Sequence, residues 1–355
     1  MKKNCIIVLL VLVATAAFAE RPMPSSENTP KLAKLLKEHP QLDLDRNGVL
    51  SLKEAKGARD SKSRQPRTNH IAPTYNDIQY DNLPATRLDF WKTESDKATA
   101  LFVWFHPGGF RAGDKVPMKT QLLEPLLKAG VSVASVNYRL TGVGPYPMQM
   151  KDSVRAIQFL RFKAAEWNID RERLAVGGGS AGSGISQWLA FHDDLANPTS
   201  NDPVERLSSR VSCALALNMQ STYDPRVIKE IIPGAAFNDG ALKPFYGLPN
   251  DWDWETANIN AQLDALIKDA SPINHLTADD PPVFIFHSER TRTDGNIHHP
   301  NFGVFLESAM KKLDIESIRK TDADYNSRDA ANEAMIRFIL YHLGGPAKER
   351  KNNSG

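Results

Sequence analysis

The sequence predicts an α/β fold: a mostly parallel sheet with helices on both faces. Three observations support it. Short apolar runs alternate with longer amphipathic stretches from residue 87 to the last helix. The run 98–105 is almost entirely apolar, which is typical of a strand buried on both faces. The stretch 173–185 reads as a short strand, a glycine turn and a helix.

The expected elements follow one another along the chain. We expect strands at 87–91, 98–105, 131–138, 173–179, 211–217 and 282–286. We expect helices at 117–129, within 146–162, directly after residue 180, at 302–313 and at 330–343. The stretch 221–270 reads as irregular. Its aromatic residues Phe245, Tyr246, Trp252 and Trp254 are expected to pack as a lid, with stacking on sugar rings as the alternative.

Composition divides the chain into a leader, a small N-terminal segment and one large domain. Residues 1–19 read as a secretory signal, because Lys2 and Lys3 precede an apolar run that ends in an A-x-A cleavage site. The other expected parts are a linker at 20–30, a calcium-binding segment at 31–56, a linker at 57–74, the α/β domain at 75–346 and a polar tail at 347–355. The leader predicts export to the periplasm or the extracellular space.

Charge and cysteine content exclude some classes of protein. The formal net charge is +2 and no basic stripe is present, so a nucleic-acid partner is not expected. After the leader, the chain has no second apolar run that could span a membrane. Cys5 belongs to the leader, so the mature chain keeps Cys213 alone and cannot form an internal disulfide. A large apolar core must therefore stabilise the fold, and the sequence leaves the oligomeric state open.

Residues 43–54 match the twelve-residue calcium loop of an EF-hand, position by position. The expected ligands are Asp43, Asp45, Asn47, the carbonyl of Val49, Ser51 and the bidentate Glu54. A solvated acidic turn is the alternative interpretation. Because a single hand is found, we expect a weak structural or adhesive Ca²⁺ site rather than a sensor.

The candidate nucleophile is Ser180, within the G-x-S-x-G pattern of residues 178–182. A serine at the tip of a strand-to-helix turn is exposed and faces the first N–H groups of the helix. Glycines two positions before and after it leave room for neighbouring backbone. The same letters also fit a dinucleotide-binding G-x-G-x-x-G, but the acidic strand end which that motif needs is replaced by the loop-like stretch 193–203. A plain tight turn is the other alternative.

From about residue 77 onward, the chain resembles the α/β-hydrolases of the hormone-sensitive-lipase and bacterial feruloyl/acetylxylan-esterase kind. The motifs that carry the resemblance are His106-Pro107-Gly108-Gly109-Phe110 with 113–115, then 136–140, 178–182 and 270–272 ahead of 281–283. The resemblance implies an α/β-hydrolase fold and a serine esterase. It leaves the substrate open between a small-molecule ester and acyl groups on a polysaccharide, and it implies no cofactor for catalysis.

The resemblance also implies an oxyanion hole made of backbone N–H groups. Gly108, Gly109 and Ala181 would supply them. Pro107 stands where a glycine is common in the family and has no N–H, so the hole would be limited to the two glycines that follow it. We expect His106 to orient this loop rather than to act in acid–base chemistry.

The acid and the base are harder to place. The family has its acid after the strand that ends near residue 287, and Asp294 fits that place better than its alternative, Glu289. The family's histidine would come before the last helix, but residues 320–327 contain none. His342, at the end of the last helix, suits a structural or surface role.

Two interpretations of the missing base remain open. His298, or alternatively His299, lies beside Asp294 and could reach Ser180, because a triad is defined by geometry and not by chain order. Otherwise the base is lost, and the protein is a catalytically impaired ligand-binding or adhesion protein on a hydrolase scaffold.

Overall fold

The computed structural model describes residues 26–27, 29–38, 49–50, 71–115 and 120–344, in two units, 1–70 and 71–355. In the first unit, helix α1 (Pro30–Glu38) lies at the start of the segment 31–56 that is expected to bind calcium. The backbone N–H of Ser26 donates to the carbonyl of Leu50 at 2.8 Å. Outside the described residues lie the leader 1–19, the tail 347–355 and the expected calcium ligands Asp43, Asp45, Asn47, Ser51 and Glu54.

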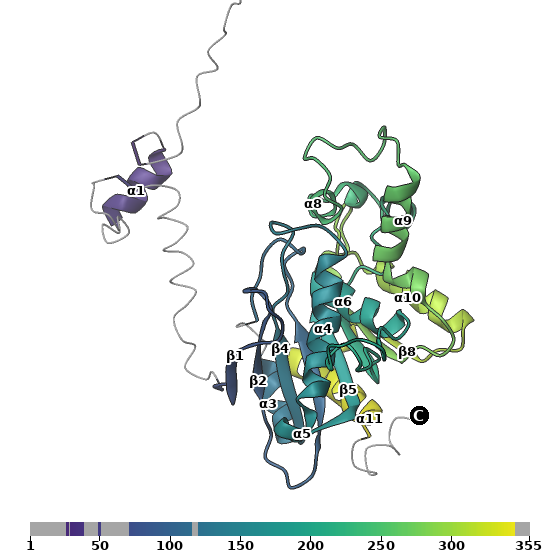
Figure 1. Ribbon diagram of the computed structural model, residues 1–355. Coiled ribbons are helices and arrows are strands. Elements are labelled where there is room, and N and C mark those ends of the chain that lie inside the picture. Colours follow the sequence, from purple (N-terminus) through teal and green to yellow (C-terminus); the bar gives the residue numbers. More distant parts are fainter. Residues whose placement is uncertain (1–25, 28, 39–48, 51–70, 116–119, 345–355) are drawn as a thin grey trace, which may run out of the picture. The chain divides into compact units, whose positions relative to one another are not determined.

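The second unit is built on one sheet (Figure 1). Its strand order is β1-β2-β4-β3-β5-β6-β7-β8. Both pairings of β2, with β1 and with β4, are antiparallel, and the other pairings are parallel. The strands are β1 (Tyr75–Gln79), β2 (Arg87–Trp91), β3 (Thr99–Phe105), β4 (Val131–Val136), β5 (Ile169–Gly179), β6 (Cys213–Leu217), β7 (Val283–His287) and β8 (Ser317–Thr321). The predicted mostly parallel sheet is confirmed.

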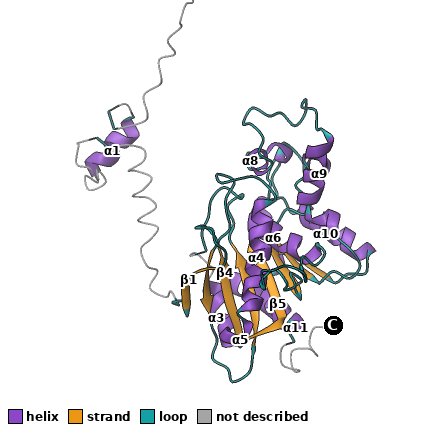
Figure 2. Cartoon of the chain, in the orientation of Figure 1, coloured by secondary structure: helices purple, strands orange, loops and turns teal. Residues whose placement is uncertain are grey.

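Helices cover both faces of this sheet (Figure 2). They include α3 (Thr120–Lys128), α4 (Met148–Phe162), α5 (Ala164–Trp167), α6 (Ala181–Phe191), α7 (Pro225–Ile231), α8 (Leu242–Phe245), α9 (Ala261–Ala270), α10 (Asn301–Lys312) and α11 (Arg328–His342). Side chains of β3 alternate between two apolar clusters, with Leu101 and Val103 packed among residues of α4, α6 and α10. Phe102 and Trp104 pack among residues of α3 and α11. This alternation explains why the whole strand is apolar.

Several elements differ from the expectation. Strands β1 and β8 are the outermost strands and were not expected, because their sequences YNDIQ and SIRKT are largely polar. A strand at the edge of a sheet needs fewer apolar residues, so it lacks the signal that marks a central strand. Helices α7, α8 and α9 lie within the stretch 221–270, which was expected to be irregular. Within the described residues, no helix is long and apolar enough to cross a bilayer.

Candidate active site

Ser180 occupies a sharp turn between β5 and α6. Its backbone has φ 51° and ψ −118°, a region that side-chain-bearing residues rarely adopt. Its N–H donates to the carbonyl of Leu217 at the end of β6, at 2.9 Å. The strained conformation is thus held by the neighbouring strand, as a strand-to-helix elbow requires.

Glycines are required on both sides of Ser180 because backbone segments approach one another closely there. A Cβ on Gly178 would lie 2.3 Å from the carbonyl carbon of Gly182. A Cβ on Gly182 would lie 2.1 Å from the carbonyl oxygen of Phe105. Only residues without a side chain let β3, β5 and the first turn of α6 meet here.

Ser183 fastens the elbow from inside. Its hydroxyl is fully buried and lies 2.7 Å from the carbonyl oxygen of Gly178 and 2.9 Å from that of Leu217. It also accepts a hydrogen bond from the N–H of Leu217 at 2.7 Å. One side chain therefore joins the start of α6 to the ends of β5 and β6.

The structure brings His298 to Ser180. The Nε2 atom of His298 lies 2.8 Å from the Oγ atom of Ser180. Burial lowers the pKa of His298 from its ordinary value, and the charge of Asp239 acts in the opposite direction. A lowered pKa leaves the imidazole neutral at pH 7, which is the form that can accept a proton.

The loop that carries His298 follows β7, and two hydrogen bonds hold the peptide unit that precedes His298. The side chain of Asn296 accepts a hydrogen bond from the backbone N–H of His298 at 2.9 Å. Gln220, three residues after β6, donates from Nε2 to the carbonyl of Ile297 at 2.8 Å. The sequence analysis did not identify Gln220. Its place shortly after a strand was a possible signal, because the ligand sites of parallel sheets lie at the carboxyl ends of the strands.

The structure does not bring Asp294 to the imidazole. Asp294 is exposed, and its charge acts on His299, whose pKa it raises against the larger effect of burial. The alternative acid, Glu289, pairs with Arg292 at 2.7 Å. Among the described residues, no carboxylate forms a hydrogen bond with His298. Asp239, which the sequence analysis missed, is the carboxylate whose charge acts on His298.

The other candidate histidines face elsewhere. His299 is buried, and its Nδ1 accepts a hydrogen bond from the N–H of Asn301 at 3.1 Å. His342 lies 3.4 Å from Glu316. Where the family has its histidine, after β8, this chain has Asp322, which accepts a hydrogen bond from Ser288 Oγ at 2.6 Å. The loop after β8 therefore supports the start of the His298 loop.

The expected oxyanion loop lies beside the elbow. Gly108 has φ +136° and Gly109 has φ +59°, and a Cβ on Gly108 would lie 1.8 Å from the carbonyl oxygen of Ala112. No backbone carbonyl among the described residues accepts a hydrogen bond from the N–H of either glycine. Ala181 is the first residue of α6, so its N–H has no acceptor within the helix. These three residues line one cavity with Ser180 and His298.

His106 orients this loop, as expected. Its ring stacks on Tyr138 with centroids 4.3 Å apart, and its Nδ1 lies 2.8 Å from the carbonyl oxygen of Pro107. Burial lowers the pKa of His106. The hydroxyl of Tyr138 donates to the carbonyl of His106 at 2.8 Å. The imidazole of His106 therefore has a structural role.

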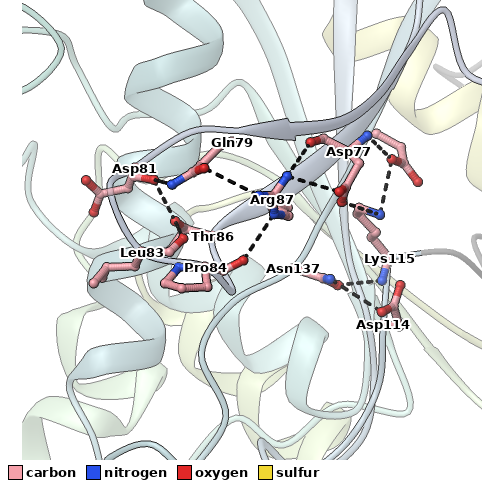
Figure 3. A network of polar contacts seen from close by, with 11 residues as sticks. Asp77, Gln79, Asp81, Leu83, Pro84, Thr86, Arg87, Asp114, Lys115 and Asn137 are labelled. Atoms are coloured by element: carbon pink, nitrogen blue, oxygen red, sulfur yellow. Dashed lines mark hydrogen bonds and ion pairs between the residues drawn. The ribbon is translucent and has the colours of Figure 1, made fainter.

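A buried ion pair fixes the far end of the same loop (Figure 3). The Nζ atom of Lys115 lies 3.2 Å from a carboxylate oxygen of Asp89 on β2 and 3.3 Å from one of Asp77. The backbone N–H of Lys115 donates to the side chain of Asn137, which follows β4, at 2.6 Å. Lys115 and Asp89 are both buried. The network ties the loop to the antiparallel part of the sheet.

The shared cavity has a volume of about 340 Å³. Its apolar wall includes Phe110, Tyr223, Leu242, Phe245 and Ile297. Part of this wall comes from the segment between β6 and β7, whose helices α8 and α9 lie together at one end of the sheet (Figure 1). Trp252 and Trp254 do not line the cavity; their rings lie 5.9 Å apart and Trp254 packs on Tyr246. The lid-packing interpretation accounts for these two residues.

The chain is similar to known esterases. Residues 88–293, more than half of the chain, match the BD-FAE family model. A probable carboxylic ester hydrolase, LipM, and an esterase, LipC, both of Mycobacterium tuberculosis, are 28% and 23% identical over 59% and 60% of this chain. The alignments cover 46% and 50% of those relatives, so the chain spans about half the length of the curated relatives it matches.

Solved structures show the same fold. An acetyl ester-xyloside bifunctional hydrolase from Caldicellulosiruptor lactoaceticus superposes with a TM-score of 0.62 at 20% identity, covering 78% of this chain and 99% of that one. A truncated carbohydrate esterase from gut microbiota gives a TM-score of 0.61 at 19% identity, covering 77% and 100%. The predicted α/β-hydrolase fold is thereby confirmed. The chain belongs to the BD-FAE family of hormone-sensitive-lipase-like α/β-hydrolase esterases.

Proposed function

We propose that this protein is a serine carboxylic ester hydrolase in which Ser180 is the nucleophile and His298 the general base. The observation that carries the proposal is the 2.8 Å contact between His298 Nε2 and Ser180 Oγ. It places a base within hydrogen-bond reach of a hydroxyl at a strained elbow, which is the geometry that activates serine.

The reaction follows from these positions. Ser180 Oγ attacks the ester carbonyl while His298 Nε2 takes its proton, and the N–H groups of Gly108, Gly109 and Ala181 stabilise the oxyanion. His298 then gives the proton to the departing alcohol, which leaves an acyl-enzyme. Water, deprotonated by His298, attacks this acyl group and releases the acid, and the proton returns to Ser180.

The alternative, a catalytically impaired binding protein, depends on the absence of a base. The position of His298 supports the hydrolase over this alternative, because an imidazole whose pKa is lowered by burial faces the serine. The arrangement differs from the usual triad, since no described carboxylate hydrogen-bonds to the imidazole. Asp239 would assist through its charge alone.

We propose short-chain acyl esters as the substrate class, including acyl groups on sugars. The apolar wall of the cavity suits a small acyl group, and its volume of about 340 Å³ lies near the lower end of ligand pockets. Esterase names among the curated relatives support ester hydrolysis, and the carbohydrate-directed names of two structural neighbours motivate the sugar part. The leader 1–19 supports export, which would bring the enzyme to extracellular or periplasmic esters.

The test compares hydrolysis of p-nitrophenyl acetate by wild type and variants. Ser180→Ala and His298→Ala should each lower kcat by roughly 10⁴- to 10⁶-fold. Asp294→Asn, in an exposed carboxylate of the same loop, should stay within about twofold. A fluorophosphonate probe should label wild type and not Ser180→Ala.

Two results would contradict the proposal. Full turnover in His298→Ala would remove the assigned base. Folded wild-type protein that neither reacts with the probe nor hydrolyses the ester would instead favour the binding protein. Melting temperatures equal to that of wild type would show that a variant has lost activity for a reason other than unfolding.

A further inference from the structure

A second group of polar side chains lies at the opposite end of the helix that begins after Ser180. His192 directly follows α6, Asp269 lies in the last turn of α9, and His275 ends the short helix η3 (Pro272–His275). One possible ligand atom from each residue lies within 4.8 Å of the others. Since α6 has eleven residues, this group is roughly 17 Å from Ser180. None of the three lines the catalytic cavity.

Each imidazole has one ring nitrogen engaged by a backbone carbonyl. His192 Nδ1 lies 3.0 Å from the carbonyl oxygen of Asp193, and His275 Nε2 lies 2.7 Å from that of Asp269. A nitrogen facing a carbonyl oxygen carries the proton, so the other nitrogen of each neutral ring carries a lone pair. Metal-ligating histidines show this pattern, in which a carbonyl fixes the tautomer and the ring orientation.

The carboxylate is oriented in the same way. The hydroxyl of Tyr146 donates a hydrogen bond to Oδ2 of Asp269. The other oxygen, Oδ1, accepts no hydrogen bond among the described residues, and it lies 3.8 Å from His275 Nε2, the nitrogen that carries the proton and is not the ligand atom. The outer partners of all three side chains are therefore in place.

The surroundings hold the group in position and leave it open on one side. The ring of Trp188 contacts that of His192 in a tilted arrangement with centroids 4.2 Å apart, and its indole N–H donates to the carbonyl of Asp269 at 2.9 Å. His192, Asp269 and Trp188 also line a cavity of about 540 Å³. Water and an ion can reach the group through this cavity.

We propose that His192, Asp269 and His275 form a zinc-binding site whose fourth ligand is a water molecule from this cavity. Two imidazole nitrogens, one carboxylate oxygen and a water are a common tetrahedral donor set for Zn²⁺. With bonds of about 2.1 Å, tetrahedral ligand atoms lie about 3.4 Å apart. Ligand atoms that lie up to 4.8 Å apart must therefore approach one another by up to about 1.4 Å when the ion binds. The bound ion would link the end of α6 to α9 and η3 and stabilise the fold.

The experiment titrates chelator-treated full-length protein with ZnCl₂ by calorimetry, with Ca²⁺ in excess so that residues 43–54 do not take up zinc. We expect one site, and a melting temperature that rises by about 5 °C or more at 100-fold excess over Kd. His275→Ala and Asp269→Asn should each weaken binding by more than about 100-fold, and Tyr146→Phe by roughly 10- to 100-fold. Co²⁺ should give the visible absorption of a four-coordinate site, which His275→Ala abolishes.

Two controls keep the result specific. His342→Ala removes an imidazole that also lies near a carboxylate, at 3.4 Å from Glu316, and should bind zinc like wild type. His298→Ala should keep the same stoichiometry, because the site does not involve the catalytic imidazole. The proposal is overturned if zinc does not bind at about 0.1 mM, or if binding survives in both His275→Ala and Asp269→Asn. Variants are compared only where their zinc-free melting temperatures match that of wild type within a few degrees. Tyr146→Phe provides the test should the ligand variants fail to fold.

Discussion

Replacing Gly182 with alanine should disable the site without touching a reacting side chain. The new methyl carbon would lie 2.1 Å from the carbonyl oxygen of Phe105 and 2.6 Å from its carbonyl carbon, whereas an ordinary contact needs about 3.5 Å. The first turn of α6 must then withdraw by roughly 1 Å. The movement carries Ser180 and the N–H of Ala181 with it. A misplacement of about 1 Å costs roughly 10²-fold in rate, and loss of one oxyanion donor costs about 10²- to 10³-fold.

We therefore expect Gly182→Ala to lower kcat roughly 10²- to 10³-fold. The change in KM should be smaller, because the apolar residues that line the cavity are unchanged. The assay is p-nitrophenyl acetate hydrolysis, with circular dichroism to show that the variant is folded. Overpacking should also cost about 1–3 kcal/mol of stability.

Gly179→Ala is the matched control in the same turn. Its new methyl carbon would meet only Pro107, at 3.8 Å, which is an ordinary contact. Its kcat should stay within about threefold of wild type. Gly182→Ala protein that is folded and retains a third of wild-type kcat would refute the reasoning, and so would an equal loss in both variants.

Three further predictions concern the base, the oxyanion loop and the N-terminal segment. Because His298 must be neutral and burial lowers its pKa, kcat/KM should rise with pH through a pKa below 6.5 and stay level above it. Asp239→Asn removes a charge that raises this pKa, so the acidic limb should move to lower pH; a move to higher pH would contradict the assignment. Lys115→Met leaves Asp89 buried without its cation and should cost about 3–5 kcal/mol in urea denaturation, whereas Lys128→Met, in an exposed pair with Glu124, should cost less than about 1 kcal/mol. If residues 43–54 bind Ca²⁺, a chelator should lower the melting temperature of wild type and leave that of Asp43→Ala unchanged.

The sequence predicts the central sheet and the elbow well, because both have strong local causes. Strand β3 is apolar on both faces, and the glycines around Ser180 are needed where backbones nearly touch. The edge strands β1 and β8 lack such a signal. One side of each outer strand has no neighbouring strand, and polar residues are tolerated there.

The residues that act together with Ser180 lie on loops. The conformation of a loop cannot be predicted from a local sequence pattern. His298 was a candidate because it was one of two histidines on the loop after β7. Its reach to Ser180 depends on Gln220 and Asn296, which hold the backbone around it. Asp294 was chosen by its place in the family's chain order, but the loop turns its carboxylate to solvent. Asp239 comes from a stretch read as irregular, where neither spacing nor periodicity could single it out.

Within the part of the chain that the structure describes, the residues that line the catalytic cavity are numbered from 107 to 298. The chain after residue 298 adds β8 to the sheet. Apolar side chains of α11, such as Phe338 and Ile339, cover one face of that sheet. Helix α11 therefore contributes to heat resistance without lining the cavity. Substitutions of apolar residues on α11 should lower the fraction of protein that stays folded on heating. The kcat of the protein that stays folded should equal that of wild type.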